Sequence, residues 1–247
     1  MLFDKKVAVI TGGSSGIGLG IAKDLAKRGA RVLITGRNPE KLEQAVAEIG
    51  QQASGMVVDI GKVADINALF ESVRDQYGRV DVLVANAGGA EPAPLRMITE
   101  DHVDDTLNTN LKGVIFTVQG ALPLMGNGGS VILIGSTASI NPPEGMSVYG
   151  AAKAGVRNLV RAWIQELKGS GIRINVVSPG PTRTPGFDAY FPEEQAEGVF
   201  ALLAEKSTVG RIGAPEDIAQ TVSFLASEAA GYINGIELFV DGGASQI

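Results

Sequence analysis

Short runs of β-branched and other apolar residues alternate along this chain with longer amphipathic stretches. Seven runs are candidate strands: Val7–Thr11, Arg31–Thr35, Gly55–Asp59, Val80–Ala85, Ser130–Gly135, Arg173–Ser178 and Ile236–Val240. The stretches between them predict helices over Ile17–Arg28, Pro39–Ile49, Val63–Tyr77, Thr99–Leu124, Tyr149–Lys168, Pro192–Glu205 and Pro215–Ala226. Several strands are apolar at successive positions, as is typical of a parallel sheet covered on both faces. The alternation therefore predicts a doubly wound (Rossmann-type) α/β fold with a seven-stranded parallel sheet and helices on both faces.

Composition narrows the classes of function. The 247 residues contain no linker, charge run or repeat, so we expect a single domain over residues 1–247. Cysteine is absent and His102 is the only histidine, which excludes disulfides, thiolate metal sites and a multi-histidine zinc site. A net charge of −6 argues against a nucleic-acid partner. Without a signal peptide or an apolar stretch long enough to span a membrane, we expect a cytoplasmic protein.

A glycine-rich turn joins the first predicted strand to the first helix, with the sequence Thr11-Gly12-Gly13-Ser14-Ser15-Gly16-Ile17-Gly18. Glycines let the backbone approach a phosphate closely, and the helix N-terminus supplies free amide donors. The turn therefore predicts a dinucleotide site, although its spacing is GxxxGxG rather than GxGxxG. The same residues match the G-x-S-x-G elbow of hydrolases, but no histidine follows His102 to complete a triad.

The second predicted strand is followed by Gly36, Arg37 and Asn38. An acidic residue here would bind the adenosine ribose 2′-hydroxyl of NAD, whereas an arginine accommodates a 2′-phosphate. Gly36 leaves room and Arg37 supplies charge, so the segment predicts NADP. The alternative is a solvated arginine at the start of a helix.

Polar residues recur at the C-terminal ends of the other predicted strands: Asp59, Asn86-Ala87-Gly88, Ser136 and Pro179-Gly180. In open α/β sheets this edge holds the ligand. Each residue alone could belong to an ordinary turn, but their coincidence on one edge predicts a shared site.

Tyr149 and Lys153 are four residues apart in a predicted helix, so their side chains share a face. A nearby cation lowers the pKa of a tyrosine from its usual value of about 10. A phenol tuned in this way can pass a proton to or from a substrate oxygen. The pair therefore indicates redox chemistry at a carbon–oxygen bond, with Ser136 available to hydrogen bond the same oxygen.

Taken together, these residues strongly resemble the short-chain dehydrogenase/reductase family in its compact single-domain type. The resemblance spans nearly the whole chain and rests on the Thr11–Gly18 turn together with Asp59, Asn86-Ala87-Gly88, Asn110, Ser136, Tyr149, Lys153, Pro179-Gly180, Thr182 and Thr184. The chain departs from the family at Ala85, where an additional asparagine is usual.

The resemblance implies an NADP(H) cofactor and a catalytic tetrad of Asn110, Ser136, Tyr149 and Lys153. Lys153 would also bind the nicotinamide ribose. Asn110 would hold a water that links Lys153 to solvent, unless it is a helix-interior asparagine that bonds locally. The cofactor-binding residues expected from motif and resemblance are Gly12, Ser14, Ser15, Gly16, Ile17, Gly18, Arg37, Asp59, Ile60, Asn86, Ala87, Gly88, Tyr149, Lys153, Pro179, Gly180, Thr182 and Thr184.

Residues 181–210 are the expected substrate lid. They contain four aromatic side chains, either an apolar substrate wall or packing that holds the lid to the body: Phe187, Tyr190, Phe191 and Phe200. Phe187, Tyr190 and Phe191 are candidate substrate residues. Glu144 and Met146, between Ser136 and Tyr149, are candidates too.

These features favour an NADPH-dependent carbonyl or ketone reductase that is reversible as an alcohol dehydrogenase. A sugar or polyol dehydrogenase and a 3-oxoacyl-thioester reductase are the alternatives within the family. A non-catalytic dinucleotide sensor is the alternative of a different class. The helix Tyr149–Lys168 is apolar nearly all round, so its outer face meets either a partner subunit or another part of the same chain. The family is commonly tetrameric, which favours a homo-oligomer.

Overall fold

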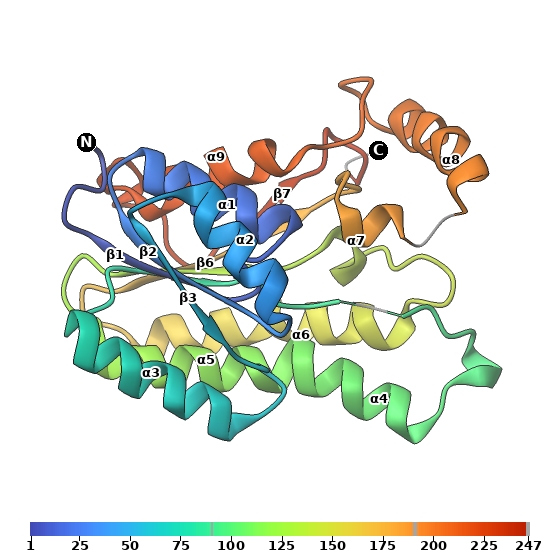
Figure 1. Ribbon diagram of the computed structural model, residues 1–247. Coiled ribbons are helices and arrows are strands. Elements are labelled where there is room, and N and C mark those ends of the chain that lie inside the picture. Colours follow the sequence, from blue (N-terminus) through green and yellow to red (C-terminus); the bar gives the residue numbers. More distant parts are fainter. Residues whose placement is uncertain (90, 190–191, 246–247) are drawn as a thin grey trace.

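The seven strands form one parallel sheet in a computed structural model of the chain, which describes residues 1–89, 91–189 and 192–245. The order is β3-β2-β1-β4-β5-β6-β7, and every neighbouring pair is parallel (Figure 1). The predicted α/β fold is therefore confirmed. The strands are β1 (Val7–Ile10), β2 (Arg31–Gly36), β3 (Ala53–Val57), β4 (Val82–Ala85), β5 (Ser130–Ile134), β6 (Arg173–Pro179) and β7 (Glu237–Val240).

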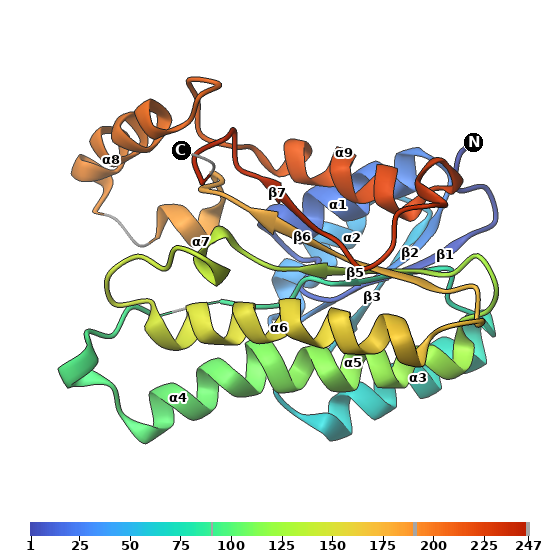
Figure 2. The same ribbon diagram turned by 180° about the vertical axis from the view of Figure 1, so that it is seen from behind.

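Helices cover both faces of the sheet (Figures 1 and 2). One face carries α1 (Gly16–Lys27), α2 (Pro39–Ile49) and α9 (Pro215–Ala226). The opposite face carries α3 (Val63–Tyr77), α4 (Glu100–Leu107), α5 (Gly113–Ala121) and α6 (Ser147–Glu166). The chain adds strands to one side of β1 and then, from β4 onward, to the other side, so the topological switch point lies between β1 and β4. In such sheets the ligand binds at the carboxyl ends of the strands around that point.

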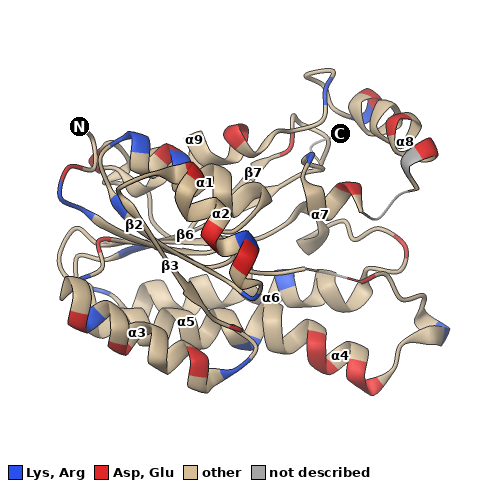
Figure 3. Ribbon diagram, in the orientation of Figure 1, with Lys and Arg blue, Asp and Glu red and all other residues tan. Residues whose placement is uncertain are grey.

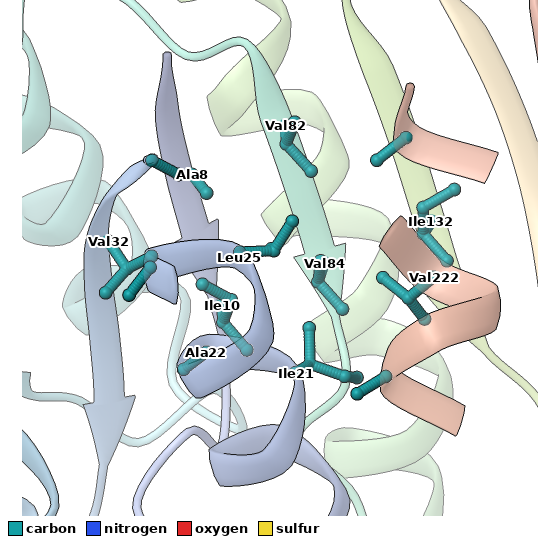
Figure 4. Close-up of a cluster of buried hydrophobic side chains, with 14 of the residues drawn as sticks. Ala8, Ile10, Ile21, Ala22, Leu25, Val32, Val82, Val84, Ile132 and Val222 are labelled. Atoms are coloured by element: carbon teal, nitrogen blue, oxygen red, sulfur yellow. The ribbon is translucent and has the colours of Figure 1, made fainter. Parts of the chain in front are cut away.

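The buried core lies in two clusters, one on each face of the sheet. Figure 4 shows part of the first, in which Ile21 and Leu25 of α1 and Val222 of α9 pack over Ile10 and Val84. A strand buried on both faces needs apolar residues at successive positions, which explains the unbroken sequence Val-Ala-Val-Ile of β1.

Helices α2, α3 and α9 have the predicted boundaries, and Thr99 caps α4 by accepting a hydrogen bond from the backbone amide of His102. The helix predicted over Thr99–Leu124 is present as a continuous helical stretch, but its hydrogen-bonding pattern changes along it: a π-helical turn, Asn108–Lys112, lies between α4 and α5, and a 3₁₀ turn, Leu122–Leu124, follows α5. In the π-helical turn the side chain of Asn110 donates to the carbonyl oxygens of Gly89 and Thr106. Such π-bulges are frequent at functional sites.

The third strand lies two residues earlier than predicted. It ends at Val57, and Asp59 lies in the following turn, where its carboxylate accepts from the amide of Gly61. The amide of Asp59 itself donates to the carboxylate of Asp65 in α3. These side-chain bonds replace the strand ladder, so the chain turns toward α3 at this point.

The expected lid segment contains two helices, α7 (Pro185–Asp188) and α8 (Glu193–Lys206). Phe200 of α8 is only 4% exposed, and its ring stacks on that of Phe187 of α7 with the centroids 6.0 Å apart. The guanidinium of Arg183 lies over the same Phe200 ring. Phe200 therefore packs the two helices of this segment against each other. Tyr190 and Phe191 lie outside the described residues.

Helix α6 packs against the sheet and against α4, so part of its apolar surface is covered by the same chain. Ala151, Ala154 and Ala162 remain exposed.

Figure 3 shows few charged residues on the strands and a concentration of acidic residues on α4. Within the described residues, no helix combines the length and apolarity that crossing a membrane requires.

Candidate active site

The glycine turn lies against the end of β4. The side chain of Asn86 donates to the carbonyl oxygens of Thr11 and Gly12, and the Thr11 hydroxyl accepts from the amides of Asn86 and Ala87 at 3.1 Å. Gly12 has φ 66°, and a Cβ there would lie 2.7 Å from Cα of Ala87. The turn therefore requires glycine for both its conformation and its packing.

The N-terminus of α1 presents free amide donors. Ser15 precedes the helix in an extended conformation, and its side chain makes no capping hydrogen bond within the described part of the chain. Gly16 has φ 54°, and a Cβ at Gly18 would overlap the carbonyl group of Gly12. Ser14 and Ile17 complete this open cradle. Uncapped amides at a helix start, next to a glycine-rich turn, fit a diphosphate.

Arg37 lies immediately after β2, exposed, and no ion pair joins it to any residue of the described chain. Gly36 lies against Ser14, since a Cβ at Gly36 would be 2.7 Å from the Ser14 hydroxyl oxygen. Asn38 caps α2 by accepting from the amide of Lys41 at 2.9 Å. The Ser14 hydroxyl and the guanidinium of Arg37 are thus both next to Gly36. Together they can bind a phosphate on the adenosine ribose.

Asp59 and Ile60 lie beyond β3 on the same edge. One oxygen of Asp59 accepts from Gly61, and Lys62 lies 3.9 Å from the other. Ile60 is buried, and its carbonyl oxygen would lie 2.6 Å from a Cβ at Gly113. Gly113 thus lets the start of α5 pack directly on this loop.

A compact polar group lies beyond the end of β4, next to the switch point of the sheet. It consists of Gly88, Asn110 and Lys153. A Cβ at Gly88 would lie 2.7 Å from Oδ1 of Asn110 and 3.4 Å from Nζ of Lys153, so Gly88 separates the two side chains. Asn110 is 1% exposed and donates to the carbonyl oxygens of Gly89 and Thr106, so it makes local backbone bonds while its side chain lies beside Gly88. The amide of Gly89 donates back to Oδ1 of Asn110.

Lys153 is 3% exposed and donates a hydrogen bond to the carbonyl oxygen of Ile134 at 2.9 Å. Its Nζ lies 5.5 Å from the centroid of the Tyr149 ring. Burial lowers the pKa of Lys153 to about 8, because desolvation penalises the ammonium form. The ammonium group of Lys153 therefore loses its proton at a lower pH than that of an exposed lysine.

Ser136 lies two residues beyond the end of β5 and begins a 3₁₀ turn, η4 (Thr137–Ser139). Its hydroxyl oxygen accepts from the amide of Ala138 at 3.1 Å, which leaves the hydroxyl proton free to donate to a ligand. A Cβ at Gly150 would lie 2.8 Å from the carbonyl oxygen of Ala138, so the first turn of α6, with Tyr149, packs directly on η4.

The segment after β6 closes the far side of the site. The amide of Gly180 bonds the carbonyl oxygen of Val240, and the hydroxyl of Thr182 donates to the carbonyl oxygen of Gly180 at 2.9 Å. Thr184 caps α7, and its side chain would lie 3.2 Å from a Cβ at Gly16. Pro179–Thr184 therefore reaches across to the glycine turn.

The candidate substrate residues that the structure describes are more exposed than Asn110 and Lys153. Glu144 is exposed and Met146 half-buried in the loop before α6, and this loop is tied to Ala93 by a bond from the Ala93 amide to the Gly145 carbonyl oxygen. Phe187 is half-buried against Phe200.

Two contacts at the candidate site were not predicted from the sequence. The Thr11 hydroxyl joins the glycine turn to the β4 end, and the Gly89 carbonyl oxygen holds the Asn110 amide. A threonine directly before a glycine turn was a visible signal for the first. The second is a backbone contact between segments 21 residues apart, which no side-chain pattern reveals.

Comparison with known proteins gives a consistent result. A family model described as enoyl-(acyl carrier protein) reductase matches residues 12–245. The chain is 42% identical over 244 residues to the oxidoreductase asL5 of Sarocladium schorii, covering 98% of this chain and 96% of that protein. It is 35% identical over 248 residues to the 3-oxoacyl-(acyl-carrier-protein) reductase FabG of Thermotoga maritima, covering 98% and 99%.

Among solved structures, the chain is similar to a short chain dehydrogenase from Burkholderia cenocepacia J2315 in complex with NADP. The TM-score is 0.91 at 34% sequence identity, and 99% of each chain is covered. Fold and sequence both agree over nearly the full length. The chain therefore belongs to the short-chain dehydrogenase/reductase family of oxidoreductases, which act on CH–OH and C=O groups.

Proposed function

We propose that this protein reduces a ketone or another carbonyl compound to an alcohol with NADPH, reversibly, and that Tyr149 is the proton donor. The observation that carries the proposal is that the Asn110 amide and the Lys153 ammonium both lie beside Gly88, with the Tyr149 ring 5.5 Å from the same ammonium. This group lies on the strand edge that also bears the glycine turn. One domain over residues 1–247 would then hold both the cofactor and the catalytic groups.

The cofactor is NADP(H). The glycine turn offers its diphosphate a cradle that a Cβ would fill, and Ser14 with the unpaired Arg37 suits the 2′-phosphate. The related Burkholderia dehydrogenase is described in complex with NADP, which supports the same choice. When bound, the reduced nicotinamide supplies the hydride.

The protein residues supply the proton and hold the oxygen. The hydroxyl of Ser136 donates a hydrogen bond to the carbonyl oxygen and stabilises the negative charge that grows on it. Tyr149 transfers its phenolic proton to that oxygen, which completes the alcohol. In its protonated form, Lys153 favours the resulting phenolate, and Asn110 holds the neighbouring backbone of Gly89 in place.

A 3-oxoacyl thioester is the second candidate substrate, and the similarity to the FabG reductase of Thermotoga maritima favours it. Residues 181–210 are the proposed substrate lid for either compound. The homotetramer implied by the family resemblance remains a prediction for size-exclusion chromatography with light scattering.

The test is NADPH consumption over a panel containing acetophenone, an unbranched alkyl ketone and acetoacetyl-coenzyme A, with glucose and NADP⁺ for the reverse reaction. We expect turnover of at least one ketone, abolished in Tyr149→Phe. Turnover of acetoacetyl-coenzyme A alone would select the second candidate. NADPH binding without turnover of any compound would indicate a dinucleotide sensor and contradict the proposal.

A further inference from the structure

Strand β7 contains one charged residue, Glu237, in an otherwise apolar sequence. Its side chain is only 9% exposed. A carboxylate removed from water in this way is costly unless it is paired and hydrogen bonded. The proposed chemistry has no step for this residue, so its partners must explain its position.

The partners of Glu237 come from three other segments of the chain. Oε1 accepts hydrogen bonds from the hydroxyls of Ser139 at 2.9 Å and Ser178 at 2.6 Å. Oε2 faces Nε of Arg157 at 3.6 Å, and the same guanidinium donates to the carbonyl oxygen of Gly235 at 3.0 Å. One carboxylate therefore joins η4, β6, α6 and its own strand.

Two of these bonds enclose Ser136. Ser139 ends the 3₁₀ turn that Ser136 begins, and its amide donates to the carbonyl oxygen of Ser136 at 2.9 Å. On the other side, Gly135 lies directly against the hydroxyl of Ser178, where a Cβ would overlap. The carboxylate thus bonds Ser139 in the turn after Ser136 and the Ser178 hydroxyl that lies against Gly135 before it.

The third partner belongs to the helix that carries the other reactive side chains. Arg157 lies four residues after Lys153 and eight after Tyr149, so all three share one face of α6. Through Arg157 and Ser139, Glu237 ties this face of the helix to η4. We propose that Glu237 is a positioning residue, which sets the Ser136 hydroxyl against the oxygen that Tyr149 protonates.

This inference rests on the proposed function, and the variants separate the two. Glu237→Gln keeps the shape and an acceptor oxygen but turns an amide donor toward Arg157. We expect kcat for the best ketone of the panel to fall about tenfold, as displacement of a catalytic group predicts, and KM for NADPH to change less than about twofold. Ser139→Ala, which removes a single bond and preserves the charge pair, is expected to lower kcat by a smaller factor in the same way.

The decisive comparison is a double-mutant cycle with Ser136→Ala. If Glu237 acts through the Ser136 hydroxyl, Glu237→Gln lowers kcat by less than about twofold once that hydroxyl is gone. Asp81→Asn is the matched control, because Asp81 is a carboxylate with an 8% exposed side chain, paired with Lys6 and Arg79 at the opposite end of the strands. It is expected to lower the melting temperature and leave kcat of the folded enzyme unchanged.

Equal effects of Glu237→Gln with and without the Ser136 hydroxyl would overturn the positioning role, as would a fall in stability with kcat unchanged. If Glu237→Gln does not fold, the same cycle with Ser139→Ala decides. Absence of turnover of every compound in the panel by the unmodified enzyme would instead refute the proposed function. The two failures are therefore distinguishable.

Discussion

The ammonium group of Lys153 lies 5.5 Å from the centroid of the Tyr149 ring, one helical turn along α6. A hydrogen bond to the carbonyl oxygen of Ile134 fixes it at the end of β5. The lysine therefore connects the helix that carries the proton donor to the strand that leads to Ser136. An ammonium group at a site with almost no solvent carries a desolvation cost, and this cost should be measurable.

Burial lowers the pKa of Lys153 from 10.5 to about 8, so between these values the unfolded chain binds the proton more tightly. The stability of the protein should consequently rise as pH increases through this window. Lys153→Met removes the linkage, and its stability relative to the original protein should fall by about 3 kcal/mol from pH 8 to 10.5. Urea unfolding of the cofactor-free protein at several pH values measures this difference, with the exposed Lys168→Met as control. A difference independent of pH would contradict the expected burial cost.

Gly88→Ala tests the spacing of Asn110 and Lys153. The added methyl would lie 2.7 Å from Oδ1 of Asn110, which is too close for any Cβ, whereas a Cβ at Gly89 meets nothing within 4 Å. Overpacking of this kind costs about 1–3 kcal/mol, which we expect chiefly as a fall in kcat of tenfold or more. Gly89→Ala should keep nearly full activity. Steady-state kinetics of both variants provide the measurement, and equal activities would show that the site tolerates displacement of Asn110.

Arg37→Asp should change the cofactor preference. Loss of a charge-assisted hydrogen bond to the 2′-phosphate costs about 1.5–3 kcal/mol, so the ratio of kcat/KM for NADPH over NADH should fall about tenfold to a hundredfold. Lys41→Asp, an equal change of charge on exposed α2, is the control and should leave the ratio nearly unchanged. An identical ratio in Arg37→Asp and the unmodified enzyme would remove Arg37 from the phosphate site.

Phe200→Ala tests the packing of the lid segment. Phe200 is 4% exposed between Phe187 and Arg183, and truncating a buried phenylalanine costs about 3–5 kcal/mol. We expect faster proteolysis within residues 181–210 and weaker ketone binding, with the ranking of substrates in the panel unchanged. A changed ranking would instead assign Phe200 to the substrate wall.

Much of the fold follows from local patterns in the sequence. The start of α2 was predictable because Pro39 marks it, and the end of α3 because Gly78 follows it. The π-helical turn between α4 and α5 was not, and neither was the bond that Asn110 in this turn makes to the backbone of Gly89 in another loop. The shift of β3 has a local cause, because Asp59 bonds within its own turn instead of extending the strand.

The candidate site was likewise predictable only in part. Glycines and polar residues at strand ends pointed to one edge of the sheet, because parallel strands place their carboxyl ends together. The network around Glu237 was not predicted, although a glutamate within the apolar run Ile236–Val240 was a visible signal. Its partners Ser139 and Ser178 are 98 and 59 residues away, so only the folded chain identifies them.

The central claim is that Tyr149 transfers the proton, and Tyr149→Phe tests it most directly. The substitution removes one hydroxyl and keeps the ring that lies beside Lys153. We predict that NADPH fluorescence titration gives a nearly unchanged dissociation constant, while kcat for the best ketone falls by more than about a hundredfold, within the range for a general acid. Retention of more than about a tenth of the original kcat would contradict this role of Tyr149 and the mechanism built on it.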